Sequence, residues 1–447
     1  MPRIAVIQTE GTRLSDWSRT IQPVRDAVHA AAQHGAELAL LPECVWPAYC
    51  IGSRAEYFAA RAAGLPSDRE FLDKLCDWAR RAGIWVCAGL VSERGDALAN
   101  SAVLVDAAGE VRHRYDKCFL WDFDNDWFEP GASLECVDTP FGRLGIMICA
   151  DARLPEISAT LTAGGAQLLL QPTAWVNAAG VDAPLWNPQA DFLIRARARE
   201  FGIPIASASK WGVEGGTTFV GSSLVCGAGG AVLTQAAKDR SEMLIADVTP
   251  SEPRPVHVTE RRRDMLARRG YGEIVCNNDR QLELAFDAGH GARDHADLGG
   301  GVTRVALALE ARNGHSPNLR AACGARELAP SEDPYDLSGV RVAVMTPAEV
   351  ESFVAPRCAA LAGALLVIVC GEAAGFTVRA RALENRVFVA GVCEGRTILV
   401  GPDGRVRHRL LGPGDCCRIH PSEAACKEVA RRSDVLRARR PGMYAFG

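Results

Sequence analysis

Short, continuously apolar segments alternate with amphipathic helical patterns through the first 276 residues of this chain. Three such segments are AELALLPE, RLGIMICAD and AQLLLQPTAW, and the first two end abruptly in polar residues. A strand that is apolar on both faces must be covered on both faces, which places helices outside a central sheet. The hairpin pattern SAVLVDAAGEVRHRYDK, with Ala108-Gly109 near its turn, makes that sheet mixed. The alternation therefore predicts an α/β fold.

This alternation divides the chain into three parts. It continues to residue 276, stops in a stretch rich in Gly, Asp and Pro over residues 277–336, and resumes for residues 337–447. Such a composition is typical of loops and linkers. We therefore predict a domain at 1–276, a linker or reduced segment at 277–336, and a smaller α/β unit at 337–447.

The last part repeats features of the first. Arg195–Ala208 reads RARAREFGIPIASA and Arg379–Val392 reads RARALENRVFVAGV, with six of fourteen positions identical. Other blocks recur in the same order, and TRVALALEA from Thr303 is a candidate echo of the opening strand RIAVIQTEG. Ordered blocks indicate an internal repeat, although similar α/β elements could also look alike by chance. We expect residues 337–447 to form a truncated copy that packs on the N-terminal unit.

Charge, hydropathy and cysteine usage exclude several classes of protein. The 447 residues include 50 basic and 54 acidic side chains, which gives no footprint of a nucleic-acid binder. The longest apolar stretch, Leu361–Cys370, is about half of a membrane span, and the N-terminus lacks a signal-peptide pattern. The 16 cysteines show no metal-binding spacing and are expected to be reduced thiols. We therefore expect a cytoplasmic protein without nucleic-acid, membrane or metal partners.

Three chemically reactive side chains stand at the ends of predicted strands. Glu43 closes AELALLPE, Lys117 closes VRHRYDK, and Cys149 closes RLGIMIC. In α/β folds ligands bind beyond the carboxyl ends of strands. There a thiol can attack, a carboxylate can remove protons, and an ammonium can support a developing oxyanion. The alternatives are ordinary packing for Cys149, an anion at a helix N-terminus for Glu43 and a solvated strand end for Lys117.

Together these motifs resemble the nitrilase superfamily of carbon–nitrogen hydrolases over roughly residues 3–275. The Glu-Lys-Cys triad of that family matches Glu43, Lys117 and Cys149, and the segment WFEPG also fits. The resemblance implies a four-layer αββα sandwich, usually dimerised through helices, so a homo-oligomer is possible. It also implies a cysteine thioester intermediate, with the side chain of Lys117 and the backbone N–H of Ala150 stabilising the oxyanion. A raised pKa for Glu43 beside a low pKa for Cys149 would suit that chemistry.

A second carboxylate is expected near the lysine. Family members often carry a glutamate seven residues before the glycine of the WFEPG-like segment, and here that position is Asp124. The shorter aspartate could act through a water. Asp122 or Asp126 could replace it, or this acidic loop could simply be solvated.

The residues after the cysteine bear on the reaction. Ala150-Asp151 resembles the amidase and carbamoylase branches, because true nitrilases typically have Trp-Glu there. In some carbamoylases the residue matching Arg153 binds the substrate carboxylate, although it is structural in many relatives. Trp175 and Trp121 could line an apolar pocket or belong to the core.

These observations predict an amidohydrolase that cleaves a non-peptide C–N bond in a small linear amide or N-carbamoyl compound without a cofactor. A nitrilase and a non-hydrolytic ligand-binding or scaffold protein on the same fold remain alternatives. The C-terminal copy is expected to be inactive, because Thr346 or Pro347 occupies the position of the nucleophile.

Overall fold

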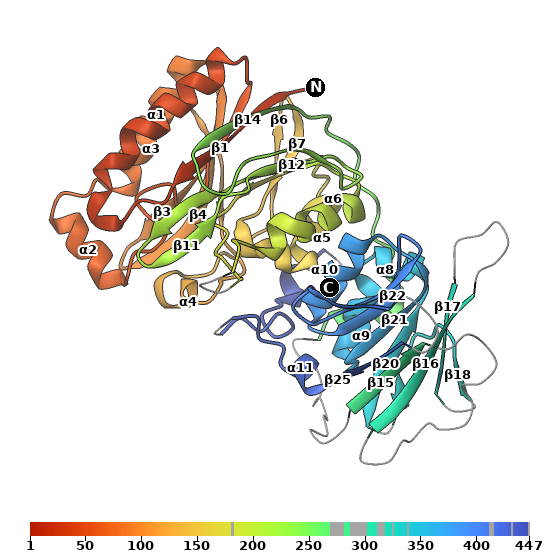
Figure 1. The fold of residues 1–447 in the computed structure, drawn as a ribbon. Helices are drawn as coiled ribbons and strands as arrows, with labels where there is room; N and C mark the ends of the chain where they lie inside the picture. Colours follow the sequence, from red (N-terminus) through yellow and green to blue (C-terminus); the bar gives the residue numbers. More distant parts are fainter. Residues whose placement is uncertain are drawn as a thin grey trace. The chain divides into compact units, whose positions relative to one another are not determined.

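The computed structural model contains two compact units. It describes residues 1–179, 183–268, 281–286, 302–310, 318–323, 326–337, 339–410, 415–430 and 432–445. The first unit consists of residues 1–256 with 443–445, and the second of residues 257–442 (Figure 1). Within the described ranges, no helix combines the length and the apolar character needed to cross a bilayer.

The larger sheet of the first unit carries the opening strand at its centre. Its strands are β1 (Arg3–Glu10), β2 (Leu38–Leu40), β3 (Trp85–Arg94), β4 (Ala97–Val105), β5 (Val111–Asp116), β10 (Lys210–Glu214), β11 (Thr217–Val220) and β14 (Glu242–Asp247). They follow the order β11-β10-β1-β2-β3-β4-β5, and β14 also pairs with β1. The strands β1, β2 and β3 are parallel, whereas β3, β4 and β5 form the predicted antiparallel hairpins. The sheet is therefore mixed, as the sequence indicated.

A second sheet packs on the first. Its strands are β6 (Cys136–Thr139), β7 (Gly142–Ile146), β8 (Leu168–Pro172), β9 (Ile205–Ala208), β12 (Leu224–Cys226) and β13 (Val232–Gln235). Their order is β13-β12-β9-β8-β7-β6. The two sheets face each other, because β1 and β2 contact β9 and β3 contacts β8.

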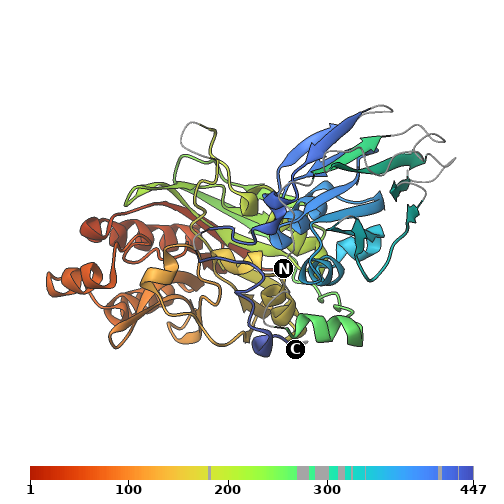
Figure 2. The same cartoon turned by 90° about the horizontal axis from the view of Figure 1, so that it is seen from below.

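Helices cover the outer faces of both sheets. The larger sheet is covered by α1 (Ser18–Gln33) and α3 (Asp68–Ala82), next to α2 (Arg54–Ala62), and the smaller one by α5 (Pro155–Ala163) and α6 (Ile194–Phe201). Figures 1 and 2 show the red and orange helices gathered at one side of the first unit. The predicted αββα sandwich is therefore confirmed for the first unit.

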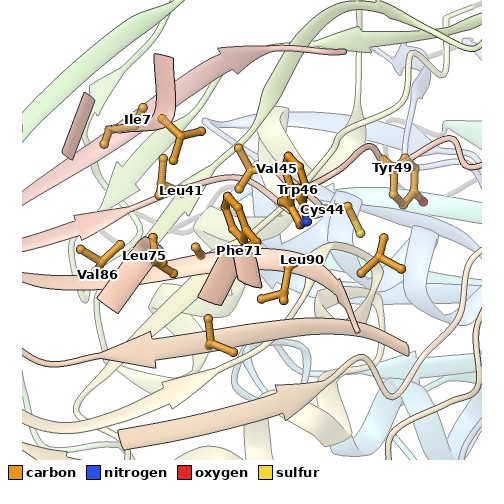
Figure 3. Packing of buried hydrophobic residues seen from close by; sticks show 14 of the residues in the cluster. Ile7, Leu41, Cys44, Val45, Trp46, Tyr49, Phe71, Leu75, Val86 and Leu90 are labelled. Carbon is orange, nitrogen blue, oxygen red and sulfur yellow. The ribbon is translucent and has the colours of Figure 1, made fainter. Parts of the chain in front are cut away.

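The helix α3 shows how local sequence sets these layers. It begins at a capping box between Ser67 and Glu70, and Gly83 ends it in the left-handed conformation. Its apolar positions, which include Phe71 and Leu75, fall on one buried face. In Figure 3 Phe71 lies flat against Trp46, with 4.8 Å between the ring centroids. This contact fixes the chain directly after Glu43 against the core.

The second unit also contains two sheets. Six strands, in the order β19-β20-β21-β22-β23-β24, form one of them; they are β19 (Tyr335–Leu337), β20 (Val340–Met345), β21 (Leu366–Glu372), β22 (Phe388–Cys393), β23 (Arg396–Val400) and β24 (Val406–Leu410). The other has the order β18-β17-β16-β15-β25; its strands are β15 (Gln281–Phe286), β16 (Val302–Glu310), β17 (Asn318–Cys323), β18 (Arg326–Leu328) and β25 (Cys416–Ile419). The helices of this unit are α7 (Glu260–Leu266), α8 (Pro347–Glu351), α9 (Val354–Leu361), α10 (Gly375–Asn385) and α11 (Ser422–Ala425).

The six-stranded sheets of the two units have the same topology. From β6 to β13 successive neighbours are antiparallel, parallel, parallel, antiparallel and antiparallel. The series from β19 to β24 repeats this sequence of directions. The topology supports the internal repeat that the sequence predicts.

Part of the segment predicted to be a linker forms β-strands. The strands β15 to β18 lie within residues 277–336, so the prediction of a linker there is wrong for the described part of that segment. β15 pairs antiparallel with β25 as β1 does with β14, so β15 rather than 303–311 corresponds to the opening strand. These strands could not be predicted from local sequence patterns, because their partners are far apart in the chain, as in the pairing of Glu283 with Arg418.

Candidate active site

Two carboxylates and one ammonium meet in the interior of the first unit. Glu43 follows β2 and Lys117 follows β5, so both stand at strand ends as predicted. The Nζ atom of Lys117 lies 2.7 Å from Oε1 of Glu43 and 2.6 Å from Oδ2 of Asp124. All three side chains are fully buried, so the lysine bridges the two acids without solvent.

Only one oxygen of Glu43 is engaged. Asn100 on β4 donates from Nδ2 to Oε1 at 2.7 Å, the same oxygen that Lys117 contacts. Among the described residues, the buried Oε2 atom has no hydrogen-bond partner. The carboxylate is therefore fixed through Oε1 while Oε2 remains able to accept a proton. Asn100 was not predicted, because nothing in the sequence pattern of β4 marks it.

Burial and charge set the protonation of this pair. Burial raises the pKa of Glu43, and the negative charge of Asp124 adds to that increase, while Lys117 opposes it. Burial alone would lower the pKa of Lys117, but Asp124 and Glu43 together raise it well above its ordinary value. The lysine is therefore held as an ammonium, and Glu43 is a stronger base than an exposed glutamate.

Cys149 stands in the sharp turn that follows β7. It begins the short helix η2 (Cys149–Arg153), has a φ of +44° and is buried. A positive φ is uncommon for a residue other than glycine, and it is typical of nucleophiles on strand-to-helix turns. Burial, together with the charge of Glu43, raises the pKa of the thiol to about 12. The expected low pKa of Cys149 is therefore wrong for this structure, because the thiol is buried beside a carboxylate.

Asp151 joins the cysteine turn to the lysine loop. One of its oxygens accepts the backbone N–H groups of Cys118 at 3.2 Å and Phe119 at 2.7 Å. The other accepts the N–H of Ile148 at 2.8 Å and the hydroxyl of Tyr115 at 2.7 Å. The residues next to Lys117 and Cys149 are thus fixed to one carboxylate, a role that no sequence pattern marks.

The acidic loop after Lys117 contributes Asp124 and not its neighbours. Asp124 begins the short helix α4 (Asp124–Trp127) and also accepts the N–H of Trp121 at 2.9 Å through Oδ2. Its contact with Lys117 is direct, without the water that the sequence left open. Asp122 is only partly buried and Asp126 is exposed. The loop therefore places the predicted carboxylate against the lysine.

The other predicted site residues lie around this cluster. Ala150 follows Cys149 in the turn and is buried. The guanidinium of Arg153 lies over the ring of Trp121, 4.2 Å from its centroid. Trp175 is fully buried, and within the described residues its Nε1 atom finds no hydrogen-bond partner. These contacts leave the substrate-binding roles of Arg153, Trp121 and Trp175 as predictions.

A second buried ion pair supports the loop after Glu43. Lys210 and Glu214 on β10 are joined at 2.8 Å. Oε1 of Glu214 also accepts the N–H groups of Tyr49 and Cys50. This pair was not predicted, because the contacts that give it a role join β10 to a loop about 165 residues earlier.

Comparison with known proteins places this site in a family. The carbon-nitrogen hydrolase model matches residues 3–257, more than half of the chain. The chain belongs to the carbon–nitrogen hydrolase family. The match confirms the predicted resemblance and covers every site residue described above.

Relatives with assigned names are enzymes of this family. A "Nitrilase" of Pyrococcus abyssi is 30% identical over 249 residues, which cover 56% of this chain and 90% of the relative. A "Deaminated glutathione amidase" of Yersinia enterocolitica is 31% identical, covering 41% of this chain and 65% of the relative. The chloroplastic omega-amidase of Arabidopsis thaliana is 31% identical, covering 56% and 68%.

Among solved structures, an amidase from Nesterenkonia sp. AN1 is similar to this chain. It shares 30% identity, with 56% of this chain and 93% of the amidase covered and a TM-score of 0.48.

Proposed function

We propose that this carbon–nitrogen hydrolase cleaves the C–N bond of a small linear amide or N-carbamoyl compound through a thioester on Cys149. One observation carries the proposal: Lys117 bridges Glu43 and Asp124 while Oε2 of Glu43 has no partner among the described residues. Such a carboxylate can exchange protons without losing its position. The Glu43 charge also acts on the Cys149 thiol, so the two groups are electrostatic neighbours.

In the first half-reaction Cys149 attacks the substrate. Oε2 of Glu43 takes the thiol proton as the sulfur forms a bond to the carbonyl carbon. The high pKa of the buried thiol keeps it protonated until that transfer. The carbonyl oxygen becomes an oxyanion, and the ammonium of Lys117 with the N–H of Ala150 stabilises it.

The tetrahedral intermediate then breaks its C–N bond. Glu43 returns the proton to the nitrogen, which leaves as ammonia or an amine, and the acyl group stays on sulfur as a thioester. A water molecule attacks this thioester while Glu43 accepts one of its protons. The acid product leaves and the thiol is restored, so the reaction balances without a cofactor.

Asp151 holds the turn of Cys149 and takes no part in the proton transfers. Its two oxygens accept four hydrogen bonds, from Tyr115, Cys118, Phe119 and Ile148, so it holds the turn and performs no proton transfer. Arg153 beside Trp121 is the candidate for binding a substrate carboxylate.

The experiment is a screen for ammonia release by the purified chain. Small linear amides, N-carbamoyl compounds and nitriles are assayed in parallel, with Cys149→Ala as the control. We expect hydrolysis of amides or carbamoyl compounds and a loss of at least about 10³-fold in Cys149→Ala. Cys149→Ser should be nearly inactive as well, because a carboxylate base generates an alkoxide poorly.

Three outcomes would overturn the proposal. Undiminished hydrolysis by Cys149→Ala would remove the nucleophile. Turnover of nitriles to acids without amidase activity would favour a nitrilase. Binding of a ligand without turnover, with Cys149 intact, would favour a ligand-binding protein.

A further inference from the structure

Gln189 lies against the nucleophile. It begins a π-helical turn, η3 (Gln189–Leu193), directly before α6, and only 2% of its surface is exposed. Its Nε2 atom is 3.9 Å from Sγ of Cys149. Single π-turns are rare and occur frequently at functional sites.

The direction of this contact is set by a chain of hydrogen bonds. Gln171 on β8 lies 2.9 Å from the carbonyl oxygen of Cys149, which can only accept, so the Nε2 end of Gln171 faces it. The same Nε2 donates at 3.3 Å to Oε1 of Gln189, and Oε1 of Gln171 accepts the hydroxyl of Ser207 at 2.7 Å. With its oxygen held by Gln171, Gln189 presents its N–H₂ group to the sulfur.

The second unit supplies an internal comparison for these residues. Leu144 pairs with Leu168 in the first unit as Val342 pairs with Leu366 in the second, a constant offset of 198 residues. That register places Pro347 at the position of Cys149.

The helices α6 and α10 align with a different offset. Arg195 donates from Nε to the carbonyl of Gly230 at 3.0 Å, and Arg379 donates to that of Gly404 at 2.9 Å. The two donors differ by the 184 residues that separate the RARA segments, and the two acceptors differ by 174.

With these registers, the hydrogen-bonded side chains of Ser207, Gln171 and Gln189 have no polar counterparts at the corresponding positions of the second unit. Gln171 corresponds to Val369, Gln189 to Ala373 and Ser207 to Gly391. A Cβ atom at Gly391 would lie only 3.3 Å from the Cβ atom of Val369, so the close approach of these strands has replaced the polar contact. Ser207, Gln171 and Gln189 are thus missing from the unit that also lacks the thiol, although the neighbouring arginine contact is kept.

We propose that Gln189 is a positioning residue that donates a hydrogen bond to the sulfur of Cys149, and that Gln171 and Ser207 hold it in that orientation. The bond strengthens when the sulfur becomes negative, because a charged acceptor binds an N–H more strongly. Gln189 therefore favours the thiolate during attack, and the bond weakens again once the thioester forms. Glu43 and Lys117 are the charged groups that act on the same sulfur, in opposite directions.

The test measures the reactivity of Cys149 without turnover. Iodoacetamide alkylation of the Cys149 peptide is followed by mass spectrometry across a pH series for wild type and Gln189→Leu. We expect Gln189→Leu to slow alkylation about ten-fold at each pH below the thiol pKa, because a lost bond to a charged acceptor lowers the thiolate fraction.

Gln189→Glu gives a readout that a packing role would not produce. A protonated carboxyl can donate to the sulfur and an ionised one cannot. The ratio of its alkylation rate to that of wild type should therefore be near one at low pH and fall as pH rises. Gln171→Leu should act in the same direction but less strongly, and its effect should largely vanish in the Gln189→Leu background.

Gln22→Leu, at an exposed glutamine on α1, is the matched control and should alkylate as wild type does. Wild-type rates at every pH in both Gln189→Leu and Gln189→Glu would overturn the proposal. If Gln189→Leu does not fold, the pH trend of Gln189→Glu decides. The proposal rests on Cys149 being the nucleophile, but its failure is distinguishable, because hydrolysis retained by Cys149→Ala defeats the proposed function whatever Gln189 does.

Discussion

The two units surround a buried lysine in opposite ways. In the first, Lys117 contacts the carboxylates of Glu43 and Asp124, which raise its pKa. In the second, Lys427 is also buried, but its Nζ donates to the carbonyls of Asn385 at 3.2 Å and Arg386 at 2.8 Å. Burial, with the nearby charge of Arg386, lowers its pKa to about 7. A buried lysine can therefore close a helix end or serve a reaction, depending on whether acids accompany it.

The contacts that the two units share are those that hold turns and helices. Arg197 donates from Nε to the carbonyl of Ala152 at 3.0 Å and pairs with Glu200. Arg381 donates to the carbonyl of Val350 at 2.8 Å and pairs with Glu384. The N–H of Ile148 reaches Asp151 just as that of Thr346 reaches Glu349.

In one ion pair the positive and negative residues have exchanged strands. Arg3 contacts Asp247 at 2.9 Å between β1 and β14, and Glu283 contacts Arg418 at 3.0 Å between β15 and β25. What persists in the second unit is structural, and what it lacks surrounds the thiol. This difference gives a way to separate folding from chemistry by mutation.

The largest expected effect is on Glu43. We expect Glu43→Gln to reduce kcat/KM by about 10²–10⁴-fold, because general base catalysis disappears while Oε1 can still accept from Lys117 and Asn100. The measurement is ammonia release with thermal unfolding as a check. Glu372→Gln, at an exposed glutamate that ends β21, is the control and should leave activity unchanged. Activity of Glu43→Gln within ten-fold of wild type would contradict the assignment.

Mutation of Arg197 and of Arg381, the corresponding arginines of the two units, should separate stability from activity. Removing one member of a buried ion pair costs about 3–5 kcal/mol, so Arg197→Ala and Arg381→Ala should each lower the free energy of unfolding by that amount. Only Arg197→Ala should also reduce turnover, because its contact at Ala152 supports the turn of Cys149. Denaturant unfolding monitored beside activity tests this, and equal loss of activity in both variants would break the comparison.

Asp151 and Glu349, the carboxylates at the corresponding turns of the two units, should also differ in their effect on activity. Asp151→Asn should lower kcat/KM about 10–100-fold, because it weakens charge-assisted bonds that fix the residues beside Lys117 and Cys149. Glu349→Gln should cost only about 1 kcal/mol of stability as a weakened helix cap, with activity intact. Wild-type kcat/KM in Asp151→Asn would show that the charge of Asp151 is not needed to hold these residues.

Asp124 should tune the base without performing the chemistry. Its negative charge raises the pKa of Glu43 beyond the effect of burial, so Asp124→Asn should move the acidic limb of the pH–activity profile to lower pH. Turnover should fall less than in Glu43→Gln. Full activity in Asp124→Asn together with inactivity in Asp122→Asn or Asp126→Asn would show that the loop register is wrong.

The last test concerns Lys427, whose removal should change stability with pH and leave activity intact. Its pKa of about 7 lies below the ordinary value of 10.5. Between these two values the unfolded lysine holds a proton that the folded one does not, so folding releases a proton. Wild-type stability should therefore gain relative to Lys427→Met as pH rises through this window and level off outside it. Denaturant unfolding of both proteins at several pH values measures the difference. A constant difference from pH 7 to 10.5 would show that Lys427 stays charged when folded.

The sequence by itself determined the main strands and helices of residues 1–276 and which reactive residues follow them. Apolar runs and capping residues act locally, so α3 and the positions of Glu43, Lys117 and Cys149 could be predicted. The ordered blocks that predict an internal repeat, such as the RARA segments, were also visible in the sequence. The strands β15 to β18 were not, since their pairing depends on distant partners.

Only the tertiary structure decided the environment of each reactive group. Water exclusion raises the pKa of Cys149, where sequence reasoning expected a low value. Asp151 and Gln189 gain their roles from atoms brought together by the fold, Gln189 reaching the thiol 40 residues away. The physical reason is that periodicity and capping are properties of neighbours along the chain. Desolvation and hydrogen-bond direction, by contrast, depend on everything that surrounds an atom in space.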